Sequence, residues 1–144
     1  MRLDEHARAL IGAGANATLV TLNPDGSPQV SVVWVACEST PEGDELVSAH
    51  LSEQYKKVRN VRRDGRVAVT IVGTDPDSVV APYLSVTGTA RIVEGGAPEL
   101  LTALTAAVAP GFVGQFPPEG APPGFLTRIR IDKIGGVGPW GSQH

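Results

Sequence analysis

Short Val- and Thr-rich runs separated by turns recur along the sequence and limit the folds that it can adopt. Residues 17–22 and 29–36 are two such runs, joined directly by Asn-Pro-Asp-Gly-Ser-Pro at residues 23–28. Proline presets φ and glycine accepts positive φ, so this hexapeptide predicts a tight turn. Two strands joined by so short a segment pair antiparallel, because a parallel pair needs a crossover of about a dozen residues or more. The pattern therefore disfavours a parallel α/β sheet.

The rest of the chain repeats this alternation, which the 17 glycines and 12 prolines also favour. Residues 83–93 alternate apolar and polar side chains, and Gly88 within them predicts a bend or a close backbone approach. We predict strands at residues 17–22, 29–36, 45–50, 66–72, 83–93 and 126–131, and helices at 3–11, 52–63 and 97–108, with Ser52 as the cap of the second helix. Residues 109–125, with five prolines and four glycines, predict a loop.

These elements predict a mainly β protein with short helices, in which six strands form a small closed barrel, because closure leaves no exposed sheet edge. The length of 144 residues predicts one domain spanning 1–144. No apolar run approaches the ~20 residues that span a bilayer, so we expect no membrane partner and a cytoplasmic protein. One cysteine, Cys37, and three scattered histidines disfavour disulfides and a metal site.

Charge is concentrated in one segment. Residues 56–66 hold six of the twelve Lys and Arg residues and one acidic residue, Asp64, which makes +5 in a chain of net charge −3. The remainder carries −8 and only 5% of residues are aromatic, so a nucleic-acid-binding barrel is disfavoured. A compact anionic ligand is the alternative that we favour.

The basic segment follows a predicted strand and begins a predicted helix. Free N–H groups at a helix start, with Lys57 nearby, suit a phosphate. A solvated basic helix face explains the same residues equally simply, since charge runs usually are solvated. Lys56, Arg59 and Arg63 share one face at i, i+3, i+7 spacing.

Four short motifs along the chain resemble, in their order and spacing, those of a known protein superfamily. The Pro-Asp-Gly turn, the Val-Val-Trp strand at 32–34, Lys-x-Arg-Asn-x-Arg-Arg-Asp-x-Arg at 57–66 and Gly-Thr-Ala at 88–90 occur in this order. Together they resemble the pyridoxamine 5′-phosphate oxidase-like superfamily, and within it the small actinobacterial deazaflavin-dependent reductases. The resemblance covers residues 5–95 well and the C-terminal third loosely.

The resemblance implies an FMN-binding type of split β-barrel, a homodimer, and a cofactor in a groove at the dimer interface. Lys57 matches the family's phosphate-contacting lysine, with Lys56 and Asn60 beside it. The resemblance places three groups of residues around the cofactor: Ser48, His50 and Leu51 at a strand end, Gln29, Val33 and Trp34 beside the ring, and Pro82 and Tyr83 from the facing subunit.

The implied cofactor is coenzyme F420, an 8-hydroxy-5-deazaflavin, or alternatively FMN. Ser48 and His50 stand where FMN-binding relatives carry other residues, which disfavours tight FMN binding. F420 carries a phosphodiester and a polyglutamate tail, and a wide basic surface suits that long anion. A reductase that transfers hydride to a small organic substrate is therefore implied, with a non-catalytic F420 carrier as another alternative.

No nucleophile–base pair or other catalytic group is evident, and a hydride-carrying ring needs mainly to be positioned and shielded from water. Tyr83 could donate a proton, but packing at an interface is the simpler explanation of that side chain. The catalytic residues and the substrate stay unassigned by the sequence.

Overall fold

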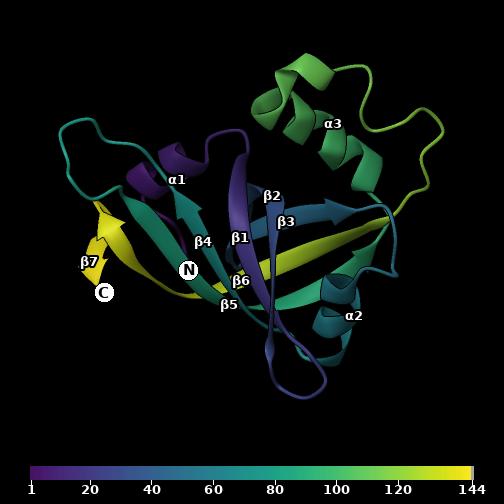
Figure 1. The fold of residues 1–144 in the computed structure, drawn as a ribbon, viewed down its shortest axis with the longest axis horizontal. Helices are drawn as coiled ribbons and strands as arrows, with labels where there is room; N and C mark the ends of the chain where they lie inside the picture. The colour runs from purple at the N-terminus through teal and green to yellow at the C-terminus, as the bar shows by residue number, and fades with distance from the viewer. Residues whose placement is uncertain (144) are drawn as a thin grey trace.

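The computed structural model describes residues 1–143; His144 lies outside the described residues. Six antiparallel strands form a closed split barrel, in agreement with the predicted fold class (Figure 1). The strands are β1 (Ala15–Leu22), β2 (Pro28–Thr40), β3 (Gly43–His50), β4 (Arg66–Val72), β5 (Tyr83–Glu94) and β6 (Phe125–Gly138). Their order is β3-β2-β1-β4-β5-β6, and pairing of β3 with β6 closes the barrel.

The predicted hairpin of β1 and β2 is confirmed. The strands pair antiparallel from Leu22–Pro28 at the turn to Ala15–Val35 at the far end. In the turn, Gly26 has φ of +86° and its N–H donates to the Asn23 carbonyl at 2.9 Å. A side chain at residue 26 would be strained in this conformation, which explains the glycine.

The C-terminal part differs from the prediction. β6 continues to Gly138, seven residues beyond the predicted end, and pairs along β5 through Gly135 and Gly136. A three-residue strand, β7 (Gly141–Gln143), then folds back on β6 and adds a seventh strand outside the barrel. Glycine-rich sequence has little strand propensity, so only the pairing with β5 explains this extension.

Gly88 confirms the predicted close backbone approach. A β-bulge shifts the β5–β6 register between Thr87 and Gly88, and a Cβ atom at residue 88 would collide with the Arg130 carbonyl oxygen. Glycine is therefore required where β6 bends across β5.

Two short helices close the barrel, at opposite ends in Figure 1. Helix α1 (Glu5–Ile11) inserts Ala7 and Ile11 into the core, next to Leu3 from the segment before it, and α2 (Lys56–Arg63) inserts Val61. The predicted start of α2 is wrong. The Ser52 hydroxyl accepts the Gln54 N–H in a local turn at 3.0 Å, and the helix begins three residues later than that cap implies, with Tyr55 as its N-cap.

Helix α3 (Ala97–Val108) matches its predicted bounds and lies outside the barrel. Leu104 and Ala107 lie so close to the backbone of Gly14 that a Cβ atom there would clash with them. Residues 109–124 form a loop, one residue shorter than predicted because Phe125 begins β6, and the loop contains one 3₁₀ turn, Pro110–Phe112. Within residues 1–143, no helix is long and apolar enough to span a membrane.

The N-terminus is anchored by the buried carboxylate of Asp44. It accepts a hydrogen bond from the Leu3 N–H at 2.7 Å and pairs with Arg8 at 2.6 Å and Arg2 at 3.3 Å. Burial alone would raise the pKa of Asp44, but these donors and the Ser39 hydroxyl hold it below its ordinary value. Helix α1 is thereby fixed over its end of the barrel.

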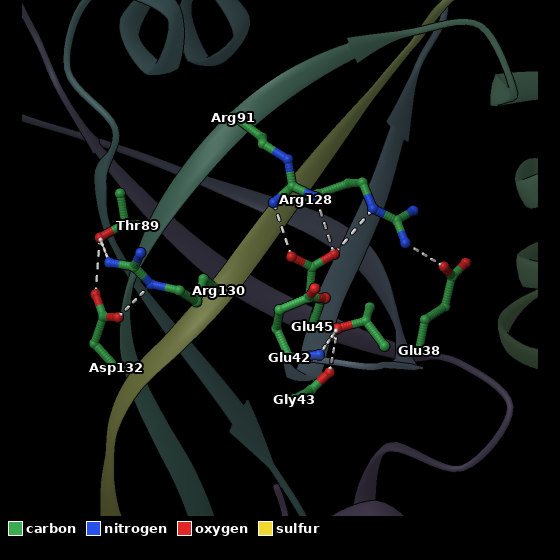
Figure 2. A network of polar contacts seen from close by, with 10 residues as sticks. Glu38, Glu42, Gly43, Glu45, Thr89, Arg91, Arg128, Arg130 and Asp132 are labelled. Atoms are coloured by element: carbon green, nitrogen blue, oxygen red, sulfur yellow. Dashed lines mark hydrogen bonds and ion pairs between the residues drawn. The ribbon is translucent and has the colours of Figure 1, made fainter. Parts of the chain in front are cut away.

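A second ionic network crosses the seam where β3 meets β6. Figure 2 shows Glu45 between Arg91 and Arg128, with Arg128 also reaching Glu38 at 2.6 Å. Hydrogen bonds from Arg91 first, and then from Arg128, lower the pKa of Glu45. The network joins β2, β3, β5 and β6 on the outside of the barrel.

Candidate cofactor groove

An open groove of about 290 Å³ lies between the end of β3, the start of α2, strand β2 and helix α3. Its lining side chains divide by chemistry into two groups, which are called the polar end and the apolar end. The polar end consists of Ser48, His50, Tyr55 and Lys57, and the apolar end of Val32, Val33, Trp34, Ala49, Leu101, Leu104 and Phe116. Lys57 is the single charged residue in this lining.

His50 is a neutral group at physiological pH. Its side chain is buried at the end of β3, with Nε2 2.7 Å from Thr127 Oγ1 on β6. Burial first, and the charge of nearby Lys57 second, lower the pKa of His50 from 6.5 to about 4. His50 therefore contributes a hydrogen-bonding ring to the groove and no charge.

Lys57 lies in the first turn of α2, where the unpaired N–H groups of a helix also favour an anion. Partial burial lowers the pKa of Lys57 from its ordinary value of 10.5. Its Nζ lies 5.2 Å from the centre of the Tyr55 ring, within the range of a cation–π contact. It forms no ion pair within residues 1–143, so its charge is available to a ligand.

The apolar end is formed by side chains from distant parts of the sequence. Trp34 on β2 and Phe116 in the 109–125 loop meet edge to face, with ring centroids 6.0 Å apart. Leu101 and Leu104 of α3 complete the wall. This surface suits a flat apolar ring, because such a ring would exchange water contacts for aromatic and aliphatic ones.

Five of the predicted site residues line the groove, namely Val33, Trp34, Ser48, His50 and Lys57. Leu51 follows β3 directly but is absent from the lining. Lys56 points to the β1–β2 turn, where it borders a separate hollow with Asp25.

Gln29 and Asn60 hold the hairpin to α2. Asn60 is buried and donates to Thr21 Oγ1 at 3.0 Å and to Asn23 Oδ1 at 3.1 Å, while the Thr21 hydroxyl donates to Gln29 Oε1 at 3.1 Å. In the single chain both residues therefore have structural partners.

Pro82 and Tyr83 lie away from the groove within one chain. Tyr83 borders a different hollow, with Lys133 and Gly135, and its carbonyl accepts the Trp140 indole N–H at 3.0 Å. Trp140 thus packs in the C-terminal tail.

The basic segment presents less free charge than its composition indicates. Arg62 pairs with Glu53 at 3.1 Å and Arg66 with Asp64 at 2.7 Å, while Arg63 donates to the Leu22 carbonyl. Only Lys56, Lys57 and Arg59 of the segment lack such a partner in the described chain. Glu53 lies before residues 56–66, so a count of the charges within that segment does not include the partner of Arg62.

Four important groove residues escape sequence reasoning. Tyr55 is obscured because Ser52 resembles a helix cap, and its actual position is the N-cap of α2. Leu101, Leu104 and Phe116 reach the groove only through the packing of α3 and its following loop. No group of three or more His, Cys, Asp or Glu side chains in the described part of the chain could hold a metal ion.

The sequence and the fold are similar to those of known proteins. Residues 3–137 match the family model described as pyridoxamine 5′-phosphate oxidase. No curated protein matches the sequence significantly. Among solved structures, an F420 reductase is 22% identical with a TM-score of 0.64, and the alignment covers 92% of this chain and 98% of that one.

Two other solved structures share the fold. A conserved hypothetical protein from Mycobacterium tuberculosis is 22% identical with a TM-score of 0.60, covering 92% of this chain and 82% of that one. HupZ from Group A Streptococcus is 15% identical with a TM-score of 0.64, covering 99% of both chains. Likeness at these identities concerns the fold.

Proposed function

Because the chain belongs to the pyridoxamine 5′-phosphate oxidase family, we propose that it is an oxidoreductase that binds coenzyme F420 in the groove and serves hydride transfer to a small organic substrate. The observation that carries the proposal is the composition of the groove, in which one lysine stands at the end of an otherwise uncharged, partly aromatic cleft. The likeness to an F420 reductase supports it.

The single charge of Lys57 favours a phosphodiester over a phosphate monoester. A monoester such as that of FMN carries about −1.5 to −2 at pH 7, because its second pKa is near 6. The diester of F420 has no second ionisable proton and carries one negative charge. With His50 neutral, the groove offers one positive charge and the α2 N-terminus, which match one negative charge.

The free cations beside the groove suit the rest of that coenzyme. Lys56 and Arg59 are exposed and lie on α2, next to Lys57 in the sequence. An acidic tail leaving the groove along this helix would meet positive charge, although less than the six cations of the segment imply. Exposed contacts of this kind contribute little individually and weaken with salt.

At the other end, Trp34 and Phe116 would contact the coenzyme's ring system and limit the access of water to it. When bound, a deazaflavin supplies a hydride from its own ring carbon, and this chain's side chains orient the ring and shield it. No charged side chain lines the apolar end. The substrate is therefore an uncharged or weakly polar molecule where it contacts this surface.

We also propose that the protein is a homodimer. Across β2, β1, β4 and β5, neighbouring residues of the outer face are small or β-branched and uncharged: Val30, Val32, Thr18, Val20, Ala68, Thr70, Ser85 and Thr87. Val30 and Val32 are 60% and 67% exposed, unusually high for valines on a central strand. Val32 also lines the groove, so a second copy on this face would border the cofactor and could bring Pro82 and Tyr83 to it.

Replacement of two neighbouring lysines tests the proposal. Lys57→Ala should weaken F420 binding, measured by coenzyme fluorescence, by about 10- to 100-fold, the range of a charge-assisted hydrogen bond. Lys56→Ala is the matched control and should change the affinity less than about threefold. Equal effects of the two substitutions would assign the lysines to a solvated basic face.

Turnover distinguishes the remaining alternatives. Reduced F420 is mixed with the protein and enones or quinones, and oxidation of the coenzyme is followed over time. F420 binding without oxidation across such acceptors would indicate the carrier role, and copurification of FMN would indicate the flavoprotein alternative.

A further inference from the structure

Tyr55 occupies a position in the groove that the proposed function does not explain. The centre of its ring lies 5.2 Å from Lys57 Nζ and 6.4 Å from the centre of the His50 ring, to which it is nearly perpendicular at 83°. Tyr55 is half-exposed as the N-cap of α2, and its side chain makes no capping hydrogen bond there. Helix capping therefore gives no reason for a tyrosine at residue 55.

Contact with the Tyr55 ring restricts the conformations of the Lys57 side chain. A free lysine samples many rotamers and loses that side-chain entropy when a ligand fixes it. An ammonium held over an aromatic face is already ordered, so a ligand finds it in place. The His50 ring packs against the Tyr55 ring edge to face, and the contact of His50 Nε2 with Thr127 fixes that imidazole in turn.

We propose that Tyr55 is a positioning residue, which holds the Lys57 ammonium at the polar end of the groove to receive a singly charged phosphodiester. The identity of that diester as part of F420 rests on the proposed function, whereas the positioning of Lys57 does not. The chain contains a matched control on the same helix: the Arg62 guanidinium lies 5.1 Å from the Phe125 ring, and neither residue lines the groove.

The test uses the fact that the chain has three lysines, Lys56, Lys57 and Lys133. Reductive ¹³C-methylation keeps their charge and gives one NMR signal for each lysine, assigned by single Lys→Arg variants. The Tyr55 ring should shift the Lys57 methyl signal upfield. Tyr55→Ala should abolish that shift, whereas Tyr55→Phe and the control Phe125→Ala should preserve it.

Ligand binding is followed on the same signal with dimethyl phosphate, a monoanionic diester. In wild type and Tyr55→Phe, half-saturation of the Lys57 shift should need about three- to tenfold less dimethyl phosphate than in Tyr55→Ala, as expected for a modest cation–π contact. Circular dichroism and thermal unfolding would verify that each variant is folded.

The possible results distinguish the positioning of Lys57 by Tyr55 from the binding of F420. A Lys57 signal insensitive to Tyr55→Ala, or equal half-saturation in Tyr55→Ala and wild type, would overturn the positioning role. Loss of affinity in Tyr55→Phe equal to that in Tyr55→Ala would also overturn it, because the hydroxyl would then be the active group. The expected NMR result in a protein that fails to bind F420 would support the positioning role and contradict the proposed coenzyme.

Discussion

Replacing His50 with Asn should remove most of the pH dependence of stability between pH 7 and pH 5. Burial lowers the pKa of His50 to about 4 in the folded protein, whereas the ordinary value of 6.5 applies to the unfolded chain. Between those values the unfolded chain binds a proton that the folded chain does not, so stability falls as the pH falls. From the two pKa values, the wild type should lose about 2 kcal/mol between pH 7 and pH 5.

Urea unfolding at pH 7, 6 and 5 measures this loss, with protein concentration fixed because association would alter apparent stability. Carboxylates contribute little in this window, since their ordinary pKa values near 4 leave them ionised in both states at pH 5. The Asn variant is expected to be less stable at pH 7 but to lose under about 0.5 kcal/mol on acidification to pH 5. An equal loss of stability in wild type and variant over this range would show that His50 does not cause the pH dependence.

Three further substitutions test the contacts that hold the barrel together. Asp44→Asn should destabilise the protein by about 2–3 kcal/mol, because Arg8 and Arg2 lose a buried ionic partner, and hydrogen exchange should show α1 opening first; unchanged exchange of α1 would contradict this. Arg128→Met should cost about 1–3 kcal/mol in urea unfolding, and Arg91→Met less, because the Arg91 side chain is 55% exposed against 19% for Arg128. The reverse order would show that Arg91 supports Glu45 more strongly than its exposure indicates.

The parts of the fold that the sequence predicted are those set by local chemistry. The turn at Gly26, the β1–β2 hairpin, the alternation along β5 and the glycine at the bulge depend on residues close together in the chain. Helix α3 was predicted with correct bounds because Gly95 and Gly96 interrupt the chain before it and a proline-rich segment follows it. Closure of the barrel was predicted from the need to leave no free edge, whereas the pairing of β3 with β6 that closes it is known only from the structure.

The parts that escaped prediction depend on contacts between distant residues. The start of α2 was misplaced because Ser52 can either cap a helix or close a local turn. Which of the two forms depends on how the chain packs at this end of the barrel, and the local sequence does not specify that packing. The extension of β6 through Gly135 and Gly136 exists because β5 offers a partner along its whole length. The apolar wall from α3 and Phe116 required knowing where α3 packs, which no local pattern specifies.

The same reason explains the overestimated charge of the basic segment. Composition counts Arg62 and Arg66 as free, whereas the fold brings Arg62 to Glu53, and Arg66 folds back on Asp64. The remaining available cation in the groove, Lys57, was identified by the resemblance and not by its charge alone. Its partner Tyr55 could be recognised only from the three-dimensional arrangement.

The most direct test of the central claim is a side-by-side titration of the protein with F420 and with FMN at one pH and salt concentration. A groove with one cation and a neutral His50 predicts that F420 binds at least about tenfold more tightly than FMN, a difference of about 1.4 kcal/mol. Tighter binding of FMN, or no detectable binding of F420 at tens of micromolar, would contradict the assignment of this groove to a deazaflavin.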